Sequence, residues 1–177
     1  MNTNASFDAW TSIGTEYKPF TGTFDGQNHT ISGLYINGTT GYVGLFGCVG
    51  TDGTAIGTVK KVTVTGSYVS GNSYVGGVCG NNVGGSVSGC YNTGDVSGSS
   101  DFGDVCGKNN RTVSNCYYLS ATSGTDSNDP NAKTKEQFVS GEVAYLLQKA
   151  LDDAASSGQN CPAGLGAEDR HGQKTCA

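Results

Sequence analysis

The feature that most constrains this chain is an internal repeat with a period of about 28 residues. Four segments align: "TISGLYING" from Thr30, "TVKKVTVTG" from Thr58, "SVSGCYNTG" from Ser86 and "TVSNCYYLS" from Thr112. A second motif follows three of them, as "VGLFG" at 43–47, "VGGVCG" at 75–80 and "FGDVCG" at 102–107. Two landmarks that recur at one spacing indicate a supersecondary unit stacked on copies of itself.

Equivalent positions of the repeats form columns of mostly apolar residues. The first motif gives three columns: Ile31, Val59, Val87 and Val113; Leu34, Val62, Cys90 and Cys116; Ile36, Val64, Asn92 and Tyr118. The second motif gives three more: Leu45, Val78 and Val105; Phe46, Cys79 and Cys106; Gly47, Gly80 and Gly107. The pattern predicts an all-β solenoid, a parallel β-helix of about four coils spaced by about 4.8 Å, in which the glycine column marks a corner without room for a side chain. An antiparallel sandwich is the alternative, but it would not require a fixed period.

A turn is expected between the first two columns, because their three-residue step breaks the strand period of two. This step carries Gly33, Lys61, Gly89 and Asn115. Glycine and asparagine tolerate left-handed backbone. Lys61 is the exception and requires either strain or a different local geometry.

The cysteine placement favours buried thiols. Cys79, Cys90, Cys106 and Cys116 fall in inward columns, where free cysteine behaves as a small apolar residue. Disulfides between adjacent coils are the alternative, and a metal site is disfavoured because no Cys-x-x-Cys or Cys/His cluster accompanies the thiols. Cys48 has no evident partner, and the total of seven cysteines leaves at least one unpaired within the chain.

The sequence divides into a β-helix at residues 1–124, a linker with helices at 125–158 and a tail at 159–177. Thr134 and Gln137 form a capping box before an amphipathic segment that Ser140-Gly141 breaks in two. We expect these helices to cover the open end of the solenoid, where strand edges would otherwise invite aggregation. Binding of a partner protein is the alternative role.

The tail has Cys161 and Cys176 near its two ends. A disulfide between them would contribute about 3 kcal/mol through loop entropy and would imply an oxidising, extracellular setting.

Charge and hydropathy exclude several classes of partner. The net charge is -5 and the pI about 4.8, and no basic cluster is present to meet nucleic-acid phosphates. No apolar run approaches the roughly 18 residues that span a bilayer, so membrane insertion is not expected. No signal peptide is visible after Met1, so an exported protein would be represented here by a fragment or a mature form.

No constellation of residues predicts catalysis, a metal site or a cofactor. His29 is interpreted as a turn residue and His171 as a solvated tail residue. Four carboxylates on turns are the candidates for a glycoside-hydrolysing pair, Asp25, Asp95, Asp101 and Asp104, but turn aspartates usually cap backbone amides.

An aromatic column is the best candidate for binding. Tyr35, Tyr91 and Tyr117 share one position of the repeat, where Thr63 takes the fourth place. The position lies between two inward ones, so its side chains should point outward and could stack on sugar rings or dock a protein. The alternative is that the rings only stabilise the sheet by cross-strand packing.

The segments "PFTGTFDGQNHTISGLYI", "VGLFG", "YVGGVCGNN" and "CYNTGDVSG" resemble the GLUG-repeat proteins of bacterial surfaces. The repeat also occurs beside IgA-cleaving metallopeptidase domains, but the zinc-binding "HExxH" is absent here. "EQFVSGEVAYLLQ" is similar to a helical segment that follows such repeats in large surface proteins of gut Firmicutes. The resemblance implies a secreted or cell-wall-attached, pectin-lyase-like right-handed β-helix.

We therefore expect a non-catalytic module of the bacterial surface, either a structural stalk or an adhesin that binds a glycan or protein. A carbohydrate-active enzyme or its inactive remnant is the alternative, and that reading depends on fold analogy alone.

Overall fold

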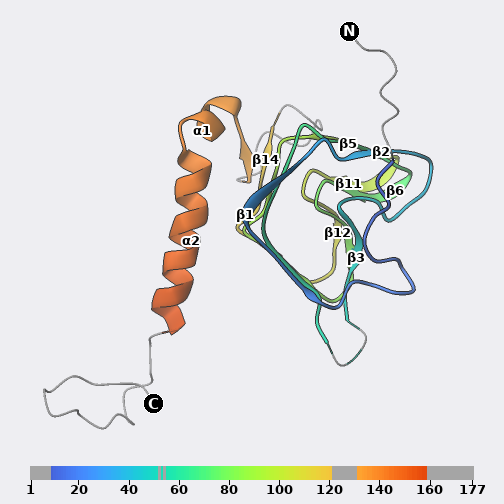
Figure 1. Cartoon of the computed structure of the whole chain (residues 1–177), viewed down its shortest axis with the longest axis horizontal. Coiled ribbons are helices and arrows are strands. Elements are labelled where there is room, and N and C mark those ends of the chain that lie inside the picture. The colour runs from blue at the N-terminus through green and yellow to red at the C-terminus, as the bar shows by residue number, and fades with distance from the viewer. Residues whose placement is uncertain (1–8, 52, 54, 121–130, 159–177) are drawn as a thin grey trace, which may run out of the picture.

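A computed structural model describes residues 9–51, 53, 55–120 and 131–158. Most of these residues wind into a parallel β-helix whose coils superimpose when viewed along its axis (Figure 1). The strands of the first two coils are β1 (Thr23–Ser32), β2 (Tyr35–Asn37), β3 (Phe46–Val49), β4 (Thr58–Thr65), β5 (Tyr68–Ser70), β6 (Ser73–Gly76) and β7 (Cys79–Asn82). The later strands are β8 (Ser86–Ser88), β9 (Tyr91–Asn92), β10 (Asp95–Ser97), β11 (Ser100–Gly103), β12 (Cys106–Asn109), β13 (Thr112–Ser114), β14 (Tyr117–Leu119) and β15 (Ala132–Lys133).

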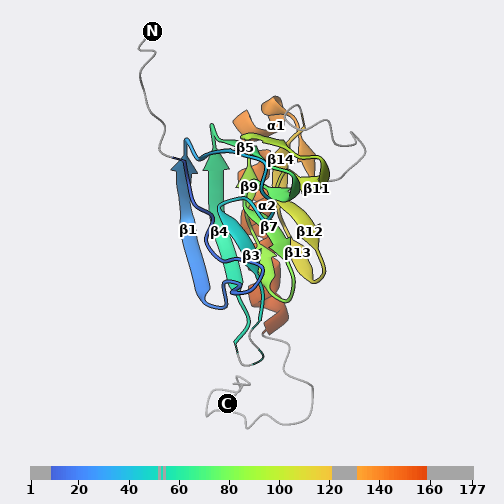
Figure 2. The ribbon, with the colours of Figure 1, turned by 90° about the vertical axis from the view of Figure 1, so that its right-hand side faces the viewer.

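The named strands pair in parallel with their equivalents in the next coil. They form sheets along the sides of the prism, with strand orders β10-β5-β2, β11-β6 and β12-β7-β3 in three of them. The largest sheet has the order β13-β8-β4-β9-β14-β15, and β1 pairs with β4 at its edge. Figure 2 shows β1 and β4 side by side. This repeated parallel pairing confirms the predicted fold class.

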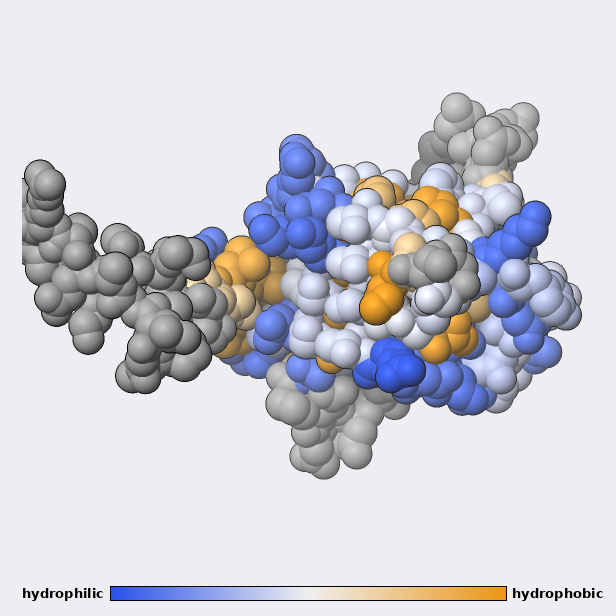
Figure 3. All heavy atoms as spheres, turned by 90° about the horizontal axis from the view of Figure 1, so that it is seen from below, coloured by the Kyte–Doolittle hydropathy of each residue, from blue (hydrophilic) through white to orange (hydrophobic). Residues whose placement is uncertain are grey.

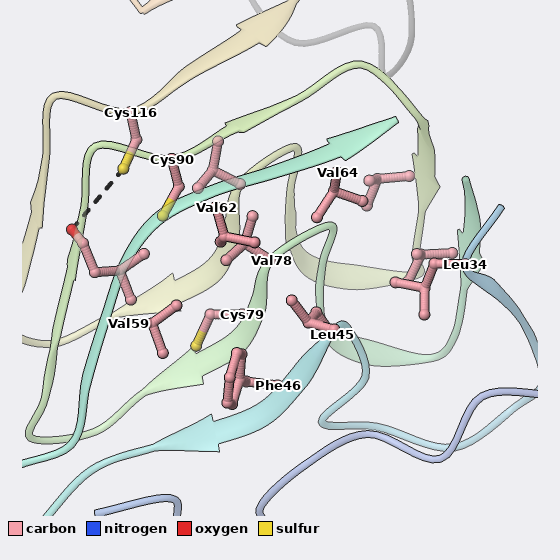
Figure 4. Packing of buried hydrophobic residues seen from close by; sticks show 14 of the residues in the cluster. Leu34, Leu45, Phe46, Val59, Val62, Val64, Val78, Cys79, Cys90 and Cys116 are labelled. Atoms are coloured by element: carbon pink, nitrogen blue, oxygen red, sulfur yellow. Dashed lines mark hydrogen bonds between the residues drawn. The ribbon is translucent and has the colours of Figure 1, made fainter. Parts of the chain in front are cut away.

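Registers confirm the predicted columns for the second, third and fourth repeats. Val59 pairs with Val87, and Val87 with Val113. Phe46 pairs with Cys79, and Cys79 with Cys106. Nearly all of these side chains belong to one hydrophobic core, part of which Figure 4 shows. Valine and cysteine fit these positions because a β-branched or small side chain packs well on a pleated, buried surface.

The predicted alignment of the first segment, "TISGLYING", is wrong, although "VGLFG" in the same coil aligns as predicted. Ile31 pairs with Val64 rather than with Val59, and Phe24 takes the place beside Val59. The main cause is a longer connection between β3 and β4, because Val49 and its partner Asn82 are 33 positions apart whereas Thr58 and its partner Ser86 are 28 apart. A register shift in β1 between Asp25 and His29 adds two more residues. Leu34 and Ile36 remain buried, but they lie one strand further along the coil, so that Ile36 pairs with Val69.

The glycine column at 47, 80 and 107 has no room for a side chain, as predicted, but it lies inside β3, β7 and β12 rather than at a corner. A Cβ atom on Gly80 would lie 2.5 Å from the carbonyl oxygen of Tyr74, and one on Gly107 would lie 2.5 Å from the backbone nitrogen of Val75. Real Cβ atoms do not approach backbone atoms this closely, so only glycine fits without a shift of the chain.

Left-handed backbone occurs at the predicted turn. Lys61, Gly89 and Asn115 have φ values of 54°, 62° and 51°. Lys61 therefore adopts the strained conformation rather than a different local geometry. In the first coil, Gln27 and Asn28 take this place, with φ values of 51° and 63°.

Two helices, α1 (Lys135–Val139) and α2 (Glu142–Gly158), follow β15. Thr134 and Gln137 form the predicted capping box, and the break falls at Ser140-Gly141 as expected. The position of α2 differs from the expectation, because it lies along the side of the prism rather than over its end (Figure 1). Its apolar residues Leu147 and Leu151 line pockets together with residues of all four coils: Asn28, Lys60, Gly89 and Asn115.

The surface is largely composed of small polar residues, as the scarcity of charge predicts. Seen from below in Figure 3, most of the prism is pale or blue, with separate orange patches. The predicted tail at 159–177, with Cys161, Cys176 and His171, lies outside the described residues.

Candidate functional site

A pocket of about 580 Å³ lies where residues 10–17 run along the N-terminal end of the prism. Trp10, Tyr17 and Tyr42 supply aromatic rings, and Glu16 supplies a carboxylate. Tyr17 is 89% exposed and Trp10 40% exposed. Exposed aromatic rings around a concave surface with a polar group are typical of small-molecule binding sites.

Backbone pairing holds this segment against the first coil. The backbone nitrogen of Trp10 donates to the carbonyl oxygen of Tyr35 at 2.9 Å, and that of Ile13 donates to Leu45 at 3.1 Å. The indole Nε1 of Trp10 donates to the carbonyl oxygen of Leu45 at 3.2 Å. The Trp10 ring is therefore fixed while one part of it stays exposed.

Tyr42 and Glu16 form the polar part of the pocket. The Tyr42 hydroxyl donates to a carboxylate oxygen of Glu16 at 2.8 Å. This hydrogen bond raises the pKa of Tyr42 to about 12, with smaller effects from burial and from the negative charge of Glu16. Tyr42 has a φ of 59°, a conformation that costs energy for a residue with a large side chain.

Tyr42 also begins a short ladder on the outside of the prism. Its ring lies 4.6 Å from that of Tyr74, and Lys108 Nζ lies 5.1 Å from the centroid of the Tyr74 ring. Tyr74 has a φ of 55°, and Asp101 in the next coil has a φ of 46°. Three successive coils thus repeat the same strained turn, and two of them use it to present a tyrosine.

The predicted ladder of Tyr35, Tyr91 and Tyr117 is not one column. Tyr35 pairs with Tyr68, and the two rings stack at 5.7 Å on a different side of the prism. Tyr91 and Tyr117 are register partners, as predicted, with Thr63 before them.

Tyr91 and Tyr117 are half-buried under the C-terminal segment. Tyr91 packs against Phe138 at 5.4 Å, and Lys133 Nζ lies 5.6 Å from the centroid of the Tyr117 ring. Burial raises the pKa of Tyr117. These two rings therefore contact β15 and α1, and Tyr91 also lines a pocket of about 340 Å³ between the sheet and the helices.

The candidate carboxylates lie in different surroundings. Asp25 caps the backbone nitrogen of Gln27 at 3.0 Å and lies 3.3 Å from Lys60 Nζ, and the first of these contacts does most to lower its pKa. Asp95 and Asp101 are exposed, whereas Asp104 is buried. His29 is exposed on β1. Among the described residues, no group of three or more His, Cys, Asp or Glu side chains could hold a metal ion.

The thiols in the described part of the chain are free. Cys48, Cys79, Cys90 and Cys116 are buried, and Cys106 is partly exposed. Burial is the largest cause that raises the pKa of Cys48, to about 11. The expectation of reduced, stacked thiols agrees with this arrangement.

Sequence reasoning missed Trp10, Glu16 and Tyr17, because these residues precede the first repeat. The available signal was Trp10 itself, the single tryptophan of the chain, which stands in a segment otherwise poor in large apolar residues.

Comparison with known proteins identifies one coil of the prism. Residues 71–97 match the family model of the GLUG motif. The match starts at the corner before β6 and ends with β10, at the equivalent corner of the next coil. No helix within the described residues is long and apolar enough to cross a membrane.

A protein of Evansella cellulosilytica, whose name calls it a Gly-rich membrane protein, is 37% identical over 62 residues. The match covers 34% of this chain and 7% of the relative's length. No solved structure matches the chain significantly. The predicted resemblance is thus confirmed, and the chain contains a GLUG motif that forms one full winding of a parallel β-helix.

Proposed function

We propose that this chain is a non-catalytic bacterial surface module that binds a glycan in the pocket formed by Trp10, Glu16, Tyr17 and Tyr42. The observation that carries the proposal is the set of exposed rings around a pocket of about 580 Å³. Sugar rings have apolar faces that pack on aromatic rings, and their hydroxyl groups need hydrogen-bond partners.

The polar groups of the pocket suit sugar hydroxyls. A carboxylate has about four acceptor positions, and Tyr42 uses one of those on Glu16. The rigid backbone of the first coil places Tyr42, and the contact of Trp10 Nε1 with Leu45 places the indole. Preorganised rings bind with a smaller loss of conformational entropy.

A glycan array probed with the full chain, followed by calorimetry on any glycan it retains, tests this proposal. Tyr17→Ala should weaken binding by about tenfold, which corresponds to the loss of one stacking contact. Tyr145→Ala is the matched control, since Tyr145 is 64% exposed on α2 and does not line the pocket. Failure to retain any glycan, or equal loss of affinity in both variants, contradicts the proposal.

The absence of catalysis is part of the proposal. It is supported by the different settings of the two carboxylates, since Asp101 is exposed and Asp104 is buried at 3% exposure. Incubation with the retained glycan should release no new reducing ends. Release that disappears in Asp101→Asn or Asp104→Asn would instead favour a carbohydrate-active enzyme.

The surface location is supported by the GLUG motif and by the name of the Evansella relative. Protease treatment of intact cells of the source bacterium should remove the protein. Protection in intact cells together with cleavage after lysis would contradict a surface location.

A further inference from the structure

The C-terminal end of the prism brings thiols of adjacent coils together. A pocket of about 320 Å³ opens there, and Cys106 and Cys116 both line it. Each lies over a cysteine of the preceding coil: Cys106 pairs with Cys79, and Cys116 precedes the paired residues Tyr91 and Tyr117 in the same way as Cys90. In each pair, therefore, one thiol faces the pocket and the other lies behind it.

The backbones of Cys90 and Cys116 lie close enough for a disulfide between adjacent coils. The backbone nitrogen of Tyr117 donates to the carbonyl oxygen of Cys90 at 3.0 Å, so the two coils are in direct contact at this point. Neighbouring strands are about 4.8 Å apart, which lies within the range of Cα separations in disulfides. Figure 4 shows the two sulfur atoms on the same side of their strands.

We propose that Cys90 and Cys116 form a redox-active dithiol, in which Cys116 reacts with a disulfide reagent that enters the C-terminal pocket and Cys90 completes an inter-coil disulfide. The Cys116 thiolate attacks a reagent RS–SR, forms a Cys116–S–S–R bond and releases RS⁻. The Cys90 thiol then loses its proton to solvent and attacks the Cys116 sulfur, which releases the second RS⁻. Two electrons pass from the protein thiols to the reagent, which ends as two thiols.

The surroundings of the pair favour this order of reaction. The contact between the two thiols lowers the pKa of Cys116, whereas the same contact and burial raise the pKa of Cys90. A thiol with a lowered pKa supplies more of the reactive thiolate. Cys116 is also the member of the pair that lines the pocket.

Oxidation of the full chain with oxidised glutathione, followed by blocking of free thiols and tryptic digestion, tests the proposal. Cys90 lies in peptide 62–108 and Cys116 in peptide 112–133. We expect a disulfide link between these peptides. A Cys79–Cys106 disulfide would lie within peptide 62–108 and could not produce this link.

Three variants decide which thiols react. Cys90→Ser should abolish the link, while Cys106→Ser and the control Cys48→Ser should retain it. Persistence of the link in Cys90→Ser overturns the proposal, as does the absence of any link in the wild-type protein. Brief alkylation of the native wild-type protein is a second measurement that needs no folded variant: Cys116 should be modified at least about tenfold faster than Cys90. Faster modification of Cys90 also overturns the proposal.

Discussion

The two ends of the prism are finished in different ways. At the N-terminal end, Phe20 and Phe24 pack on Phe46 at 5.0 and 5.3 Å between ring centroids, and residues 10–20 hydrogen-bond along the first coil. At the C-terminal end, β15 pairs with β14, but the inner residues beside it line a pocket of about 320 Å³.

The difference is visible along a single sheet. All residues of β3 and β7 are buried, whereas in β12 three residues are half-buried and the last is exposed. These strands have equivalent positions and similar sequences. Burial in a solenoid therefore depends less on the residue than on whether a coil has a neighbour on both sides.

The largest expected effect concerns the N-terminal end of the prism, where the aromatic rings pack. Phe46→Ala should lower the free energy of unfolding by about 3–5 kcal/mol, because it removes a fully buried ring and leaves a cavity between Phe20 and Phe24. Denaturant titration followed by circular dichroism measures the loss. Phe102→Ala is the matched control, since Phe102 is 38% exposed and should cost about 1 kcal/mol or less. Similar costs for both variants would show that the aromatic cluster does not stabilise this end.

A smaller effect compares two valines of one column. Val87 is fully buried between coils, and Val113 is half-buried in the last coil. Val87→Ala should cost about 2 kcal/mol and Val113→Ala less than about 1 kcal/mol, because the cost of truncation depends on how completely the site is enclosed. The same titration measures both. Equal costs would mean that the last coil is as well packed as the centre.

Hydrogen exchange sharpens the comparison without a mutation. Amides of β12 should exchange at least about tenfold faster than those of β7, because local opening needs less free energy where fewer buried contacts are broken. Mass spectrometry of native protein after timed labelling measures both segments. Equal protection would contradict the inference that the C-terminal end opens first.

The smallest expected effect is a pH dependence of folding stability that arises from Tyr42 at the N-terminal end of the prism. The folded-state pKa of Tyr42 is about 12 and its ordinary value 10, so the folded protein retains a proton that the unfolded chain loses. The stabilisation of the folded state by protonated Tyr42 is therefore fully present below about pH 10 and is lost as the pH rises toward about 12. Thermal melts of the wild type and Tyr42→Phe across this range should show a steeper decline in the wild type. Parallel declines would rule out the contribution of the Tyr42–Glu16 contact.

The sequence contained enough information to predict the columns of three coils. Val59, Val87 and Val113 recur at a nearly constant spacing, and their burial on a parallel stack follows from that period. The first coil could not be aligned in this way. Tyr35 and its partner Tyr68 are 33 positions apart, because the connection between β3 and β4 contains five residues more than the 28-residue period allows. A strand alternates its faces every two residues, so a shifted alignment still gave a plausible apolar pattern.

The candidate site was harder to predict than the fold. The pocket combines residues before the repeat, Trp10 and Tyr17, with Tyr42 inside it, and repetition gives no signal for such a combination. The lateral position of α2 was equally inaccessible, since an amphipathic pattern shows that one face is covered but not by which surface.

The place of α2 has a consequence for how the molecule unravels. In most solenoids each winding interacts only with its immediate neighbours, so the outermost winding can detach while the others remain intact. Here a single rod lies across windings that are far apart in the stack, from Asn28 to Asn115. Loss of the last winding must therefore also disturb the packing of α2 on the first winding. The stabilities of these two windings are coupled although the windings do not touch each other.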